Sequence, residues 1–314
     1  MKLVIAEPLA VSETLISHLF QPLQEAGWTL ELYDNRPQDQ VELGRRLSSA
    51  DAAVIANYPC TAKALEMAAN LKYLCIAFTG VDHADIDYCR DHHIAVSNCA
   101  GYSTEAVAEL VFGMALSLSR DLIHADSAVR QGKSNAEFLG TELAGKRFGI
   151  IGTGAIGCRT AALAHAFGCE VWGWSRTPKD SSIHYTDLKT LLSTSDILSI
   201  HLPLTEETRH LISGQELALM KSTAILINTA RGPIVDSAAL AEALKAGRIG
   251  GAGIDVYDQE QPPLPADHPL LSAPHCLLTP HLGFFSTEAM KRRAAIVFEN
   301  IEAWMAGCQK NIIC

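Results

Sequence analysis

Four side chains suited to acid–base chemistry or anion binding lie in three segments of the second half of the chain. They are Arg231 in INTARGPIVD, Asp255 and Glu260 in GIDVYDQEQPPLP, and His281 in LTPHLGFFSTEA. Each segment starts with residues typical of a buried strand, and in open α/β sheets ligands bind at the carboxyl ends of the strands. Any one of these side chains alone is more often structural or solvated. Their combination therefore carries the prediction of one shared catalytic site.

A glycine-rich turn precedes these segments in the chain. The short strand RFGII leads into Gly152-Thr-Gly154-Ala-Ile-Gly157, which opens a helix. The first glycine permits a tight turn, the second lets the backbone approach a pyrophosphate, and the third allows the helix to pack close to the strand. The motif alone is a weak signal, but the strand before it and the strand EVWGW after it favour a dinucleotide-binding turn. The predicted cofactor contacts are Gly152, Gly154, Ala155, Ile156 and Gly157.

The end of that second strand carries Ser175 and Arg176, at the place where an acidic residue would bind the ribose 2′-hydroxyl of NAD. A neutral serine followed by arginine suits a 2′-phosphate instead, with Lys179 assisting. We therefore expect NAD(P)(H) as the cofactor, leaning towards NADP(H). The other interpretation, in which Arg176 stacks on the adenine or points into water, stays open.

The elements that must position these residues follow from alternating aliphatic runs and helical patterns. Strands are expected near 3–6, 29–33, 52–56, 73–78, 94–97, 147–151, 170–174, 196–200, 224–228, 250–255 and 276–279. Helices are expected near 13–26, 39–49, 61–69, 85–92, 103–120, 155–167, 187–193, 213–220, 236–246 and 286–306. Strands joined by helical crossovers predict an α/β fold with two doubly wound parallel sheets.

Composition restricts the class of protein further. The chain has 314 residues and 48% hydrophobic residues, enough for two domains with separate cores. Nine cysteines, scattered and odd in number, indicate neither a disulfide framework nor a zinc site, and the His92–His93 pair has no partner set for a metal. No signal peptide or membrane span is expected, so we predict a cytoplasmic protein. The net charge of −10 argues against nucleic-acid binding.

Together, the three segments and the glycine turn resemble the signatures of the D-isomer-specific 2-hydroxyacid dehydrogenases, and the resemblance extends over the whole chain. It implies a Rossmann-type nucleotide-binding domain, residues 99–283, inserted into a flavodoxin-like substrate domain made of residues 1–98 and 284–314. It also implies a homodimer, with the long helix after Ser103 in the dimer-forming region.

The resemblance assigns catalytic roles by position. Arg231 would hold the substrate carboxylate and polarise its keto oxygen, and His281 would be the general acid for keto reduction and the base for the reverse reaction. Glu260 would hydrogen-bond the imidazole and raise its pKa. Asp255 would contact the nicotinamide carboxamide, with the backbone near Ala230 assisting.

Two segments match the family more loosely. AFTGVDHAD resembles a loop whose backbone N–H groups, at Gly80 and Val81, would bind the substrate carboxylate, and His83 stands in it where the family usually has Asn. NCAGYSTEAVAEL resembles the family's hinge segment, which would place Thr104 near the cofactor, although Ala100 stands where Pro is common. The remaining residues assigned to the cofactor site are His201, Pro203, Thr208 and Gly283.

The sequence thus predicts an oxidoreductase that transfers a hydride between NAD(P)H and a small 2-keto acid, with glyoxylate and hydroxypyruvate foremost. A nucleotide-sensing, co-repressor-like binding protein without turnover remains an alternative, although it would be expected to carry partner-binding extensions. A phosphoglycerate dehydrogenase is a second alternative, weakened because ANYPCT (56–61) has no arginine for a substrate phosphate. A methyltransferase using the same glycine turn would not explain the later motifs. A formate dehydrogenase is disfavoured because the additions expected of that enzyme are not apparent.

Overall fold

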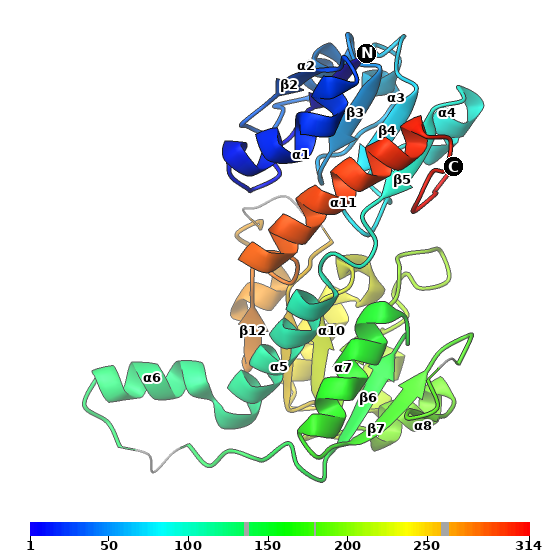
Figure 1. Cartoon of the computed structure of the whole chain (residues 1–314). Coiled ribbons are helices and arrows are strands. Elements are labelled where there is room, and N and C mark those ends of the chain that lie inside the picture. Colours follow the sequence, from blue (N-terminus) through cyan, green and yellow to red (C-terminus); the bar gives the residue numbers. More distant parts are fainter. Residues whose placement is uncertain (135–137, 179, 259–263) are drawn as a thin grey trace. The chain divides into compact units, whose positions relative to one another are not determined.

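Runs of aliphatic residues form the parallel strands of two separate sheets, and the helices between them form the crossovers (Figure 1). The computed structural model describes residues 1–134, 138–178, 180–258 and 264–314. The chain divides into one unit of Met1–Ser103 with Phe285–Cys314 and a second unit of Thr104–Phe284. The predicted α/β fold class is confirmed. The functional names given to the two domains stay a prediction.

The first unit holds a five-stranded parallel sheet in the order β2-β1-β3-β4-β5. Its strands are β1 (Lys2–Ile5), β2 (Thr29–Leu32), β3 (Ala52–Ile55), β4 (Tyr73–Ile76) and β5 (Ala95–Asn98). Its helices are α1 (Glu13–Glu25), α2 (Gln40–Leu47), α3 (Ala62–Leu65), α4 (Ile86–Asp91) and the returning α11 (Thr287–Met305). The central strands β3 and β4 are buried along their whole length, as a sheet covered on both faces requires.

The second unit holds a seven-stranded parallel sheet in the order β12-β11-β10-β9-β6-β7-β8. Its strands are β6 (Arg147–Ile151), β7 (Glu170–Trp174), β8 (His184–Tyr185), β9 (Ile197–Ile200), β10 (Ile225–Asn228), β11 (Gly251–Ile254) and β12 (Cys276–Leu278). Its helices are α5 (Thr104–Arg120), α6 (Leu122–Arg130), α7 (Ala155–Ala166), α8 (Leu188–Thr194), α9 (Gly214–Leu219) and α10 (Ser237–Lys245). The direction of winding reverses between β6 and β9, which is where doubly wound sheets bind their ligands.

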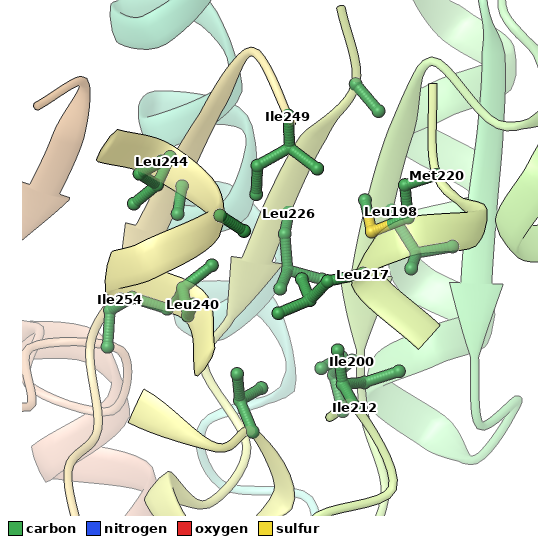
Figure 2. Packing of buried hydrophobic residues seen from close by; sticks show 14 of the residues in the cluster. Leu198, Ile200, Ile212, Leu217, Met220, Leu226, Leu240, Leu244, Ile249 and Ile254 are labelled. Carbon is green, nitrogen blue, oxygen red and sulfur yellow. The ribbon is translucent and has the colours of Figure 1, made fainter. Parts of the chain in front are cut away.

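Successive residues of the central strands point to opposite faces of this sheet, and each face has its own core. On one face, Leu198 and Leu226 pack with Leu217 of α9 and Leu240 of α10 (Figure 2). On the other face, residues such as Ile197 and Ile225 join the cluster that includes α5 and α7. The strands are thereby held rigidly, and the loops at their carboxyl ends start from fixed positions.

Helix α6 and strand β8 were not predicted from the sequence, and α3 is shorter than expected. Asp121 has a left-handed backbone (φ 49°), so α5 ends before it and α6 starts a new direction. Ile123 and Val129 are exposed on α6, and Ala128 is its one buried residue. A helix without a buried apolar stripe leaves no helical periodicity in the sequence.

Candidate functional site

The three polar segments follow neighbouring strands of the second unit. Strands β10, β11 and β12 pair in register, with Asn228 opposite Ile254 and Ile254 opposite Leu278. Arg231, Asp255 and His281 come shortly after the ends of these strands, so the structure brings them to the same edge of one sheet.

The loop that carries Arg231 is fixed by Asn228, a residue that the sequence analysis missed. The Asn228 amide donates to the Arg231 carbonyl at 2.9 Å, and its oxygen accepts from the Ala230 N–H at 3.0 Å. A Cβ atom on Gly232 would lie 2.0 Å from the Tyr257 carbonyl carbon, so only glycine lets this loop approach the segment after β11. Arg231 itself is half-buried, and its Nη1 donates to the Ala230 carbonyl at 2.8 Å.

His281 lies in a tight turn after β12 with a left-handed backbone (φ 55°). Its N–H donates to the backbone carbonyls of Asp255 at 2.9 Å and Thr279 at 3.1 Å. Its ring is half-buried and meets the Phe284 ring edge to face, with 5.1 Å between centroids. The imidazole is therefore held in a defined environment at the carboxyl edge of the sheet.

Asp255 is fully buried beside this turn, and its carboxylate accepts hydrogen bonds from the Thr279 hydroxyl and from the N–H groups of Leu282 and Gly283. Burial raises the pKa of Asp255, while these three hydrogen bonds and the nearby His281 act in the opposite direction. Glu260, the predicted partner of His281, lies outside the described residues.

The glycine turn after β6 has the geometry that a phosphate cradle requires. Gly152 has a φ of 95°, which favours glycine, and a Cβ on Gly157 would lie 2.0 Å from the Gly152 carbonyl oxygen. A Cβ on Gly154 would meet no atom within 4 Å, so the backbone there faces open space. Gly154 is also the N-cap of α7, and no side chain caps this helix. The first N–H groups of α7, which include those of Ala155 and Ile156, are suited to binding an anion.

The end of β7 has Ser175 and Arg176 as predicted from the sequence, but the structure adds a partner for the arginine. Nη1 of Arg176 lies 3.3 Å from Oε2 of Glu207, and both side chains are 77% exposed. The Ser175 hydroxyl lies 3.3 Å from the Thr177 N–H. Lys179 lies outside the described residues.

The loop after β9 contains three of the residues assigned to the cofactor. Nε2 of His201 lies 2.9 Å from the Ser199 hydroxyl, and burial lowers the pKa of the imidazole to about 3. The Thr208 hydroxyl donates to the Pro203 carbonyl at 2.8 Å. Because its pKa is lowered in this way, the His201 ring is neutral at neutral pH. The His201 carbonyl would lie 2.6 Å from a Cβ on Gly152, so this loop packs directly against the glycine turn.

The loop that contains Gly80 and Val81 lies in the first unit, after β4. Its His83 ring nitrogen lies 2.8 Å from the Ala56 carbonyl, and the Cys60 N–H donates to the His83 carbonyl at 2.8 Å. The loop is thus attached to the segment after β3. Thr104 is the first residue of α5, in the second unit.

Comparison with known proteins identifies the family. Residues 112–283 match the sequence profile of the D-isomer specific 2-hydroxyacid dehydrogenase NAD binding domain. A glyoxylate reductase of Thermofilum pendens is 40% identical over 283 residues, which cover 86% of this chain and 83% of that relative. This chain belongs to the D-isomer-specific 2-hydroxyacid dehydrogenases. The predicted family is therefore confirmed.

Two further comparisons cover nearly the whole dehydrogenase. A glycerate dehydrogenase of Methylorubrum extorquens is 37% identical over 92% of this chain and 90% of its own length. The solved structure of an acyclic imino acid reductase in complex with NADPH and D-Arg is 33% identical, covers 100% of both chains and has a TM-score of 0.92.

These relationships define the class of reaction. The dehydrogenase is an NAD(P)-dependent oxidoreductase that acts on a CH–OH group and interconverts 2-keto acids and D-2-hydroxy acids. The alternative of a nucleotide-sensing protein without turnover is not favoured. Among the described residues, no helix combines the length and the apolar composition that a membrane span requires.

Proposed function

We propose that this dehydrogenase reduces short unphosphorylated 2-keto acids, with glyoxylate and hydroxypyruvate as the best substrates. The observation that carries the proposal is that Arg231 and His281 follow neighbouring strands at the carboxyl edge of the sheet that also carries the glycine turn. An anion-binding fork and a proton donor at that edge suit a 2-keto acid, which has a carboxylate beside the carbonyl to be reduced.

In this proposal the residues of the chain bind, orient and protonate the substrate. The Arg231 guanidinium binds the carboxylate and polarises the keto oxygen, and the backbone N–H groups of Gly80 and Val81 bind the carboxylate as well. The protonated His281 ring gives its proton to the keto oxygen as this becomes a hydroxyl, and takes it back in the reverse reaction. Glu260 keeps the ring protonated. A bound reduced nicotinamide supplies the hydride, and the glycine turn and the first turn of α7 fit its pyrophosphate.

The first unit offers little for a substrate phosphate. The segment ANYPCT (56–61) has no arginine, and the nearby Arg36 lies over the Tyr58 ring. Its Nε is 3.9 Å from the buried Glu7 carboxylate, which offsets its charge. With a net charge of −10 on the whole chain, a doubly charged phosphate ester would be repelled unless it was specifically paired.

A substrate panel tests this proposal. Loss of reduced nicotinamide absorbance is followed with glyoxylate, hydroxypyruvate, pyruvate and 3-phosphohydroxypyruvate, each with NADPH and with NADH. We expect the highest kcat/KM with glyoxylate or hydroxypyruvate. The substrate proposal is wrong if 3-phosphohydroxypyruvate gives the highest value.

The similarity to the imino acid reductase favours a second candidate reaction, the reduction of a 2-imino acid. A 2-imino acid offers the same carboxylate to Arg231 and a C=N bond in place of the C=O bond. The same panel, repeated with methylamine added to each keto acid, distinguishes the two. A marked increase in turnover on adding the amine would favour imino acid reduction, and an unchanged rate would favour the keto acid.

We further propose that the cofactor is preferentially NADP(H), bound at its 2′-phosphate by Ser175 and Arg176. Surface ion pairs contribute little to stability, so a phosphate can displace Glu207 from Arg176 at small cost. A well-formed charge-assisted hydrogen bond contributes roughly 1.5–3 kcal/mol, about one to two powers of ten in affinity.

We expect Arg176→Ala to lower the ratio of kcat/KM for NADPH to that for NADH by about tenfold. Glu207→Gln, the matched variant, should raise this ratio, because it removes the charge that competes with the phosphate for Arg176. An unchanged ratio in Arg176→Ala would contradict the proposed binding of the 2′-phosphate by Arg176.

A cytoplasmic homodimer completes the proposal. All nine cysteines lie in the described part of the chain and carry free thiols, which suits a reducing compartment. Helix α6 exposes Leu122, Ile123 and Val129, and Leu139 after it is fully exposed. Apolar side chains gathered on one segment favour contact with another protein surface, and a second copy of the chain is the partner proposed here.

A further inference from the structure

The carboxylate of Asp255 is surrounded by donors from the turn that carries His281. Oδ1 accepts from the Thr279 hydroxyl at 2.5 Å and from the Leu282 N–H at 2.6 Å, and Oδ2 accepts from the Gly283 N–H at 2.7 Å. In addition, the backbone carbonyl of Asp255 accepts from the His281 N–H at 2.9 Å. One residue therefore binds the backbone or side chain of four residues between 279 and 283.

The turn has little freedom to rearrange around this carboxylate. A Cβ on Gly283 would lie 3.0 Å from Oδ2 of Asp255, so the turn packs tightly against the carboxylate at this position. The Thr279 carbonyl is itself bound by the Tyr257 hydroxyl at 2.9 Å and by the His281 N–H at 3.1 Å. A non-glycine residue in the left-handed region, as His281 is, persists only where its surroundings determine its conformation.

We propose that Asp255 is a positioning residue for His281: its carboxylate holds the 279–283 turn so that the imidazole presents its proton in one fixed orientation. This inference rests on the proposed function, in which His281 is the proton donor. It differs from a contact to the nicotinamide, because the groups that Asp255 binds in the structure belong to the turn. A buried carboxylate is costly unless donors surround it, and three donors from this turn do so.

Substitution of Thr279 tests the inference without touching a residue assigned to the cofactor. Thr279→Val removes the hydroxyl donor and keeps the shape, whereas Thr279→Ser keeps the donor. We expect Thr279→Val to lower kcat with glyoxylate about tenfold or more, since small displacements of a catalytic group are costly. Thr279→Ser should retain the kcat of the parent, and the dissociation constant of the reduced cofactor should be unchanged in both. A parental kcat in Thr279→Val, or an equal loss of cofactor affinity, overturns the inference.

Asp255→Asn gives the stronger perturbation, because its amide NH₂ must face at least one of the donors that the carboxylate binds. Hydrogen exchange of the peptide covering 279–285 is measured in the parent and in this variant, with Ser195→Ala, at the buried C-cap of α8, as the control. We expect faster exchange at Leu282 and Gly283 in Asp255→Asn alone. Unchanged exchange overturns the inference. This readout does not need turnover. If the parent enzyme is inactive on every keto acid, the proposed function is refuted, and the exchange rates still show whether Asp255 holds the turn.

Discussion

His281 and Arg231 are the two side chains on which the proposed chemistry depends, and they should be separable from cofactor binding. We expect His281→Gln to lower kcat for glyoxylate by about 10²–10⁴-fold, the usual contribution of a general acid. Arg231→Lys should also lose most activity, because lysine lacks the planar fork that binds a carboxylate. Calorimetric titration with the reduced cofactor should give parental affinities for both variants. Near-parental turnover of His281→Gln would show that another group donates the proton.

His201 should make the stability of the protein depend on pH. Its pKa is lowered by burial to about 3 in the folded protein, against about 6.5 in an unfolded chain. The unfolded state therefore binds a proton first, and stability is lost as the pH falls from 6.5 towards 3. The side chain is half-buried, so we expect a loss of about 1 kcal/mol between pH 7 and pH 5. Thermal unfolding of the parent and of His201→Gln, both without cofactor, checks this. The thermal midpoint of the variant relative to that of the parent should be higher at pH 5 than at pH 7.

The glycine turn at the start of α7 offers a matched pair of substitutions at the scale of one element. Gly157→Ala would place a Cβ 2.0 Å from the Gly152 carbonyl oxygen, so we expect a lower thermal midpoint and poor folding. Gly154→Ala meets no atom within 4 Å and has a permitted φ of −74°, so the fold should be kept. Its methyl group would occupy the space for the pyrophosphate, so cofactor affinity should fall about tenfold or more. Parental cofactor affinity in Gly154→Ala would argue against phosphate binding at this turn.

At the scale of the whole molecule, the exposed apolar residues of α6 predict the oligomeric state. We expect the parent to sediment as a dimer, and Ile123→Glu with Val129→Glu to shift it to a monomer, because charges would be buried unpaired in the contact. Leu271→Glu, at another exposed leucine of the same unit, should leave the dimer intact. A parent that is monomeric at all concentrations would refute the homodimer.

The sequence by itself determined the features that depend on local spacing. Aliphatic runs alternating with helical patterns predicted the described strands of both sheets except β8, because burial of both faces leaves uninterrupted apolar segments in the central strands. Glycines at fixed intervals predicted the turn after β6, since a tight turn and a close helix approach each require a residue without a side chain. The motifs after β10, β11 and β12 predicted the family, because the types, order and spacing of their residues resemble the signatures of that family.

Only the tertiary structure decided what the individual side chains contact. The partners of the Asp255 carboxylate lie 24, 27 and 28 residues further along the chain, and the register of β11 with β12 brings them together. Glu207 reaches Arg176 from a separate loop, 31 residues away, and so introduces a competitor that no local pattern indicates. Helix α6 was missed because its apolar residues face outward. Contacts of this kind depend on strand order and register, which the spacing of residues along the chain does not specify.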